Sequence, residues 1–152
     1  MKALCWNGTH DVRVEEVPDP TILNPRDAIV RVTSTALCGT DLHLYNGLMP
    51  TLQPGTILGH ESLGEVVEVG SAVRTLKRGD RVVVSALVSC GECRFCRDGH
   101  FGQCDNGNPF GELTEKMAGY ACCGVLGHPL SFGGYAGGQA QYVRVPFADV
   151  GA

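Results

Sequence analysis

The sequence predicts a single, mainly β domain with the character of a β-barrel. Short runs rich in β-branched residues alternate with turn signals, and no long helical periodicity is present. Glycine makes up 21 of the 152 residues, about twice the usual share of roughly 7%. The chain also lacks a G-x-G-x-x-G motif between a strand and a helix and an alternating βαβ pattern, which argues against dinucleotide binding of that kind.

The first half of the predicted barrel begins with a hairpin. Residues 2–6 and 12–17 are apolar-rich runs on either side of a turn cluster containing Asn7-Gly8. Prolines then discourage regular structure until residues 28–36 (AIVRVTSTA), whose β-branched side chains predict a strand.

A short helix and three more strands complete the prediction. Thr40 can cap one or two helical turns that run to Tyr45. Residues 64–69 (GEVVEV), 81–88 (RVVVSALV) and 141–145 (QYVRV) predict strands. The glycine-rich stretch before residue 138 shows little periodicity.

Composition excludes several classes of function. Charged residues are 18% of the chain and the net charge is −4, which argues against a nucleic-acid surface. No apolar run approaches the roughly 18 residues of a membrane helix, so we expect no membrane partner. The apolar start is too short for a signal peptide, and we expect a cytoplasmic protein.

The chain has eight cysteines, some at C-x2-C spacing. In a reducing compartment this spacing indicates metal binding or redox chemistry rather than structural disulfide bonds. The strongest motif is a C-x2-C-x2-C-x7-C ladder. Four thiolates at such spacing are typical of a closed structural zinc site. The step of seven residues differs from the ferredoxin pattern for iron–sulfur clusters, and buried free thiols or disulfides are the other alternative. The ladder consists of Cys90, Cys93, Cys96 and Cys104, and we call residues 89–111 the cysteine lobe.

A second constellation lies upstream, in CGTDLH (residues 38–43) and the following Gly59-His60-Glu61. The Cys38 thiolate and the His60 imidazole are ligands that zinc prefers, and a catalytic zinc site keeps one position open. Taken alone, the pair is also compatible with a buried thiol and an ordinary loop histidine.

The motifs together resemble those of the N-terminal, GroES-like catalytic domain of the zinc-dependent medium-chain alcohol dehydrogenases. The resemblance rests on CGTDLH, GHESLGEVVEVGSAV, KRGDRVVV and the cysteine ladder, in that order. It covers the chain from Met1 to about Val145 and implies a partly open GroES-like β-barrel with short helices and a zinc lobe. GGYAGGQAQYVRVPFAD (residues 133–149) is most similar to the formaldehyde-dehydrogenase-like branch.

The resemblance implies roles for individual residues. Cys38 and His60 match two ligands of the catalytic zinc, and Glu61 matches an acidic residue that can ligate the metal transiently. Asp41 matches the carboxylate that accepts from the ligand histidine. The four cysteines of the ladder match the ligands of the structural zinc.

The implied reaction oxidises a small-molecule alcohol to an aldehyde or ketone through a zinc-bound alkoxide, with hydride transfer to NAD or NADP. Thr40 matches the hydroxyl that takes the proton. His43 matches the histidine at the outer end of this relay, which is reached through the cofactor ribose.

The family's cofactor-binding Rossmann domain and the third protein ligand of its catalytic zinc are absent from these 152 residues. We therefore expect one catalytic domain, residues 1–152, from a longer enzyme that is a homodimer or homotetramer, and we expect the isolated piece to be inactive. The alternative is a non-enzymatic, zinc-stabilised GroES-like binding or scaffold domain. The substrate, the choice of NAD or NADP and any role of Cys122 and Cys123 stay open.

Overall fold

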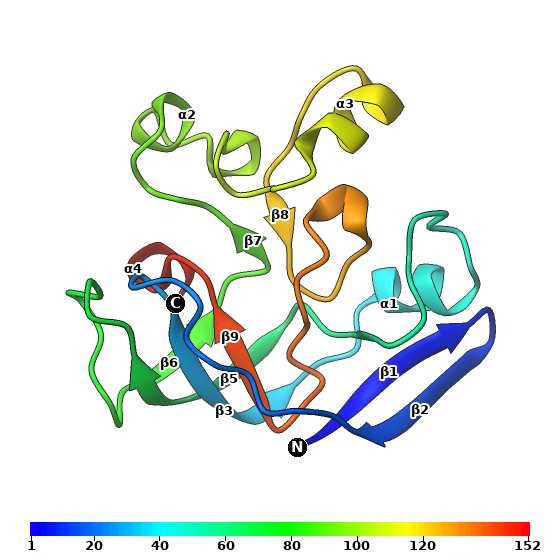
Figure 1. Cartoon of the computed structure of the whole chain (residues 1–152), viewed down its shortest axis with the longest axis horizontal. Helices are drawn as coiled ribbons and strands as arrows, with labels where there is room; N and C mark the ends of the chain where they lie inside the picture. Colours follow the sequence, from blue (N-terminus) through cyan, green and yellow to red (C-terminus); the bar gives the residue numbers. More distant parts are fainter.

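The computed structural model describes every residue from Met1 to Ala152 (Figure 1). It is mainly β, as the sequence predicts. None of its helices combines the length and the apolar character that a membrane-spanning segment requires. The elements in chain order are β1 (Lys2–Gly8), β2 (Asp11–Glu16), β3 (Ala28–Thr35), α1 (Gly39–Tyr45), β4 (Thr56–Ile57), β5 (Ser62–Val69), β6 (Arg81–Val84), β7 (Leu87–Val88), α2 (Arg94–Arg97), the 3-10 turn η1 (Phe101–Gln103), α3 (Gly111–Ala118), β8 (Gly124–Val125), the 3-10 turn η2 (Leu130–Phe132), β9 (Tyr142–Val145) and α4 (Ala148–Gly151).

The main sheet has four antiparallel strands in the order β6-β5-β3-β9. Strands β5, β6 and β9 alternate between buried and more exposed side chains, as expected for a sheet with one face on the core. Burial of this apolar face is the main favourable contribution to folding. The core against it consists of Ala28, Val30, Val66, Val82, Val84, Val88, Leu126, Val143, Val145 and Ala148.

A second sheet, in the order β2-β1-β4, contains the predicted hairpin. Its turn lies at Thr9 and His10, whereas the sequence favoured Asn7-Gly8, which belongs to the end of β1. His10 adopts a positive φ of 62°, and its backbone N–H donates to the carbonyl of Tyr45 at 2.8 Å. The hairpin thus fixes the C-terminal end of α1.

Helix α1 is where the sequence predicts it, but its N-cap is Cys38 rather than Thr40. Asp41, in the first turn, accepts a hydrogen bond from the Cys38 backbone N–H at 2.9 Å. A carboxylate in this place satisfies a donor that the helix leaves free and complements the helix dipole. Thr40 is therefore a helical residue with a side chain that takes no part in the cap.

Two further parts of the sequence prediction need correction. The single strand expected over residues 81–88 is divided, because β6 joins the main sheet and β7 pairs with β8 in a separate two-stranded ladder. The glycine-rich stretch contains helix α3, which the lack of periodicity had hidden. Helix α3 is only eight residues long, and its C-cap is Gly119, which has a φ of 82°.

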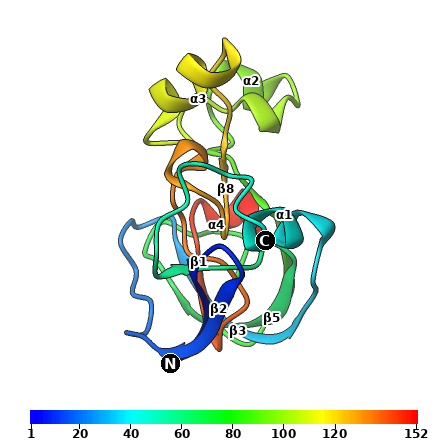
Figure 2. The ribbon, with the colours of Figure 1, turned by 90° about the vertical axis from the view of Figure 1, so that its right-hand side faces the viewer.

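Figures 1 and 2 show α2 and α3 at one end of the molecule, beyond the two larger sheets. The β7–β8 ladder leads from the body of the domain to this end. The four cysteines of the ladder pack together in the cysteine lobe. Cys90, Cys96 and Cys104 are buried, and Cys93 is partly buried against them.

The backbone of residues 58–59, before β5, packs directly on the backbone of residues 137–139, before β9. A Cβ at Gly137 would overlap the carbonyl oxygens of Leu58 and Gly59. Gly59 has a φ of 100°, and a Cβ there would lie 2.5 Å from the backbone nitrogen of Gln139. Gly137, in a glycine pair that does not match a dinucleotide loop, is needed for this close approach.

We predict that Gly137→Ala lowers the free energy of unfolding by about 1–3 kcal/mol, because the added methyl group has to push the two segments apart. Chemical denaturation measures the effect. Gly8→Ala is the matched control, since a Cβ at Gly8 meets no atom within 4 Å, and it should change the free energy by no more than about 0.5 kcal/mol. Equal effects of the two substitutions would contradict the packing argument.

Candidate metal centres

The cysteine ladder forms a compact cluster in the structure. The sulfur atoms of its four cysteines, Cys90, Cys93, Cys96 and Cys104, lie within 4.8 Å of one another and could hold a metal ion. None of the four forms a disulfide. The x2 steps place Cys93 at the N-cap of α2 and Cys96 inside it, and η1 brings the chain back to Cys104.

Hydrogen bonds to the sulfur of Cys90 favour its thiolate. The backbone N–H groups of Glu92 and Cys93 donate to it at 3.4 and 3.3 Å, and the side-chain amide of Asn106 donates at 3.3 Å. Burial opposes ionisation, but these donors outweigh it and lower the pKa of Cys90 to about 6.

The other buried thiols resist ionisation without a cation. Burial raises the pKa of Cys96 to about 12 and also raises the pKa of Cys104. Four sulfur atoms this close can be thiolates together only when a positive ion lies between them. Donor type, number and spacing therefore fit a closed tetrathiolate zinc site.

The second constellation also comes together. One ligand atom from each of Cys38, His60 and Glu61 lies within 4.8 Å of the others. Cys38 follows β3 at the start of α1, and His60 and Glu61 immediately precede β5. The His60 side chain is 10% exposed, while Glu61 is exposed.

Asp41 lies behind His60. The Nδ1 atom of His60 is 3.6 Å from Oδ1 of Asp41, and neither of these buried atoms has a hydrogen-bond partner. A carboxylate oxygen on this side of the ring favours a proton on Nδ1, which would leave Nε2 free for a metal ion. The arrangement fits a borderline-soft metal ion held by one thiolate and one imidazole.

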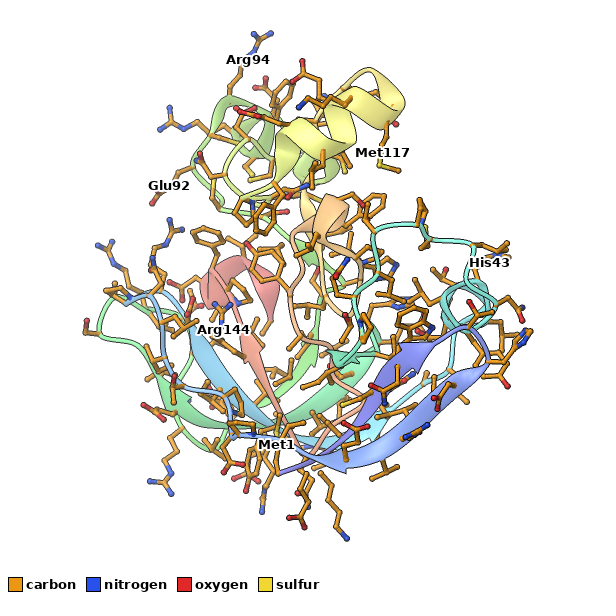
Figure 3. All side chains as sticks on the ribbon, turned by 45° about the vertical axis from the view of Figure 1, so that its right-hand side comes forward. Met1, His43, Glu92, Arg94, Met117 and Arg144 are labelled. Atoms are coloured by element: carbon orange, nitrogen blue, oxygen red, sulfur yellow. The ribbon has the colours of Figure 1, made fainter.

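The two predicted relay residues lie at different depths. The Thr40 hydroxyl oxygen is 3.7 Å from the sulfur of Cys38, so it borders the metal cluster directly. His43 is exposed, and Figure 3 shows it on the outer side of α1. Thr40 and His43 are three residues apart in the helix and so share a face.

His128, to which the sequence analysis assigned nothing, packs against His60. The ring centroids are 5.0 Å apart in an edge-to-face arrangement, and His128 Nδ1 donates to the carbonyl of Leu126 at 2.9 Å. Burial lowers the pKa of His128, and the nearby His60 lowers it further. No local pattern marks this histidine, because the contact joins distant segments.

Gln139 is the second residue that the sequence analysis missed. It is 8% exposed, and its side-chain amide donates to Oδ2 of Asp41 at 3.2 Å. Its backbone is fixed by the contact with Gly59 described above.

A largely apolar groove of about 480 Å³ adjoins the second cluster. It provides room for a small molecule or for another part of a protein beside the candidate metal ligands. Its lining consists of Ser34, Thr35, Ala36, His60, Glu61, Ser62, Leu63, Val83, Val84 and Ala86.

Comparison with known proteins shows which family the chain is related to. The protein-family model of the alcohol dehydrogenase GroES-like domain matches residues 24–151 of the chain. An uncharacterized zinc-type alcohol dehydrogenase-like protein of Bacillus subtilis is 48% identical over 149 residues, which are 98% of this chain and 37% of the relative. The glutathione-independent formaldehyde dehydrogenase of Pseudomonas aeruginosa is 40% identical over 97% of this chain and 36% of its own length.

Solved structures show the same relationship. The alcohol dehydrogenase of Thermus sp. ATN1 superimposes with a TM-score of 0.86 and 37% identity, over 99% of this chain and 39% of that protein. The chain thus spans a little over a third of the length of its relatives. The fold and the resemblance that the sequence predicted are confirmed, and the chain belongs to the alcohol dehydrogenase GroES-like domain family.

Proposed function

We propose that this chain is the catalytic domain of a zinc-dependent, NAD(P)-linked alcohol dehydrogenase. The cluster of Cys38, His60 and Glu61, with Asp41 behind His60, carries the proposal. A protein that used metal only to stabilise its fold would have no need of a second, partly exposed set of ligands beside an apolar groove. The formaldehyde dehydrogenase and zinc-type relatives support the same reaction class.

The two clusters have different roles in this proposal. The tetrathiolate cluster uses every coordination position and braces the cysteine lobe. Cys38 and His60 hold the catalytic zinc, and Glu61 ligates it transiently from the solvent side. A zinc ion at this site supplies Lewis acidity that lowers the pKa of a bound alcohol.

Thr40 accepts the proton that the substrate hydroxyl loses. Its hydroxyl lies beside Cys38, close to where a ligand of the metal has to be. His43, exposed on the same helix face, passes the proton to water. Asp41 orients His60 and strengthens it as a ligand, and NAD or NADP, when bound, accepts the hydride.

The proposal also covers the full-length enzyme, and this part of it is supported by the resemblance to the alcohol dehydrogenase family. Residues 1–152 form the catalytic domain, a Rossmann domain elsewhere binds the cofactor, and His43 contributes to the cofactor site. The substrate is a small alcohol or aldehyde. The enzyme is a cytoplasmic homodimer or homotetramer.

A zinc-stabilised scaffold without catalytic activity is the alternative. It requires the tetrathiolate cluster alone. The two proposals therefore differ in the number of metal ions that each chain binds.

We predict that Cys38→Ala in the full-length protein lowers the zinc content by about one ion per chain, because the site loses its thiolate and keeps from this domain only one imidazole and an exposed carboxylate. Elemental analysis of purified protein measures this. Cys122→Ala is the control, since Cys122 belongs to neither cluster, and it should leave the zinc content unchanged. Unchanged zinc in Cys38→Ala would favour the scaffold.

We also predict that Thr40→Val lowers kcat for alcohol oxidation by about 10²–10⁴-fold, the range expected for loss of a positioned proton acceptor. The zinc content should stay at the wild-type value, since valine keeps the shape of threonine. Thr40→Ser, which retains the hydroxyl, should recover most of the rate. A Thr40→Val enzyme of normal activity would remove Thr40 from the mechanism.

A further inference from the structure

Gln139 is held in place at both ends of the residue. Its backbone N–H donates to the carbonyl of Leu58 at 2.9 Å, and its carbonyl accepts from the N–H of Leu4 at 2.8 Å. Gly59, immediately before His60, lets the chain approach the Gln139 nitrogen. The segment that carries the candidate metal ligand His60 is therefore in direct contact with Gln139.

The side-chain amide of Gln139 can point in only one way. Its Nε2 lies 3.2 Å from Oδ2 of Asp41 and 3.2 Å from the carbonyl oxygen of Ala36. Both partners only accept hydrogen bonds, so the NH2 group has to face them. The two amide hydrogens are then both used, while the buried Oε1 has no partner. The two donated bonds thus determine the orientation despite the cost of an unpaired acceptor.

The two oxygen atoms of the Asp41 carboxylate have different surroundings. Oδ2 accepts from Gln139 and from the backbone N–H of Cys38 at 2.9 Å. Oδ1 is left without a hydrogen-bond partner and faces Nδ1 of His60. Asp41 is 4% exposed, so no bulk water competes for either oxygen.

We propose that Gln139 is a positioning residue for the catalytic metal site, which acts through Asp41 on His60. By donating to Oδ2, it prevents the carboxylate from rotating and keeps Oδ1 directed at His60. The imidazole then keeps its Nδ1 proton and presents Nε2 to the metal. The inference rests on the proposed function, because it requires that Cys38 and His60 bind a metal ion.

The test measures the affinity of the full-length protein for Co²⁺ by competition with a chelator. The four-cysteine cluster of the lobe serves as an internal reference. The Co²⁺ binding that is lost in Cys38→Ala is assigned to the Cys38–His60 site. Gln139→Met, similar in size but without a donor, should weaken Co²⁺ binding at the Cys38–His60 site about tenfold, the low end of the 10–100-fold loss for groups behind a metal ligand. Binding at the lobe should not change.

Gln141→Met is the matched control. The side chain of Gln141 accepts a single, exposed hydrogen bond from the Lys2 backbone N–H at 2.8 Å. Both Co²⁺ affinities should therefore stay at wild-type values in this variant. If Gln139→Met fails to fold, Gln139→Leu replaces it. This variant also removes the donor, adds no charge beside Asp41 and should weaken the same site.

A double-mutant cycle with Asp41→Asn separates positioning from a merely structural role. If Gln139 acts through Asp41, Gln139→Met has little further effect on Co²⁺ affinity in the Asp41→Asn background. An equal loss in both backgrounds, or a wild-type affinity in Gln139→Met, would overturn the inference. If Cys38→Ala removes no class of Co²⁺ sites, the proposed function itself has failed.

Discussion

The contact between backbone segments at Leu58–Gly59 and Gly137–Gln139 is the constraint on which the candidate active site depends. It joins two loops that are far apart in the sequence, and glycine is the only residue that permits it at residues 59 and 137. His60 follows one segment and Gln139 ends the other, so the contact brings the metal-ligand loop to the start of α1, where Asp41 lies. Loops positioned by a rigid sheet scaffold are where binding residues concentrate.

The two cysteine-containing clusters place similar ligands in different surroundings. In the lobe, four sulfur atoms lie close together, three of them from buried cysteines, and backbone and side-chain N–H groups support the thiolate of Cys90. At the second cluster, a single thiolate and one imidazole are accompanied by an exposed carboxylate and an apolar groove. Coordination that is complete suits a structural site, and coordination that is incomplete suits one that exchanges ligands.

Local patterns made much of this molecule predictable. The spacing of the ladder and the CGTDLH and GHE segments identified all seven residues of the two clusters, and β-branched runs located most strands. The division of residues 81–88 between two sheets was not predictable, since it depends on which partner strand each half meets. His128 and Gln139 were missed for the same reason: their contacts with His60 and Asp41 join segments far apart in the sequence.

We propose above all that the chain has two separate metal sites, one closed and one open. Anomalous diffraction from crystals of the full-length protein, recorded on either side of the zinc absorption edge, tests it most directly. The account predicts two zinc peaks per chain, one among the four sulfur atoms of the lobe and one beside Cys38 and His60. A single peak confined to the lobe, in crystals grown with zinc, would contradict it.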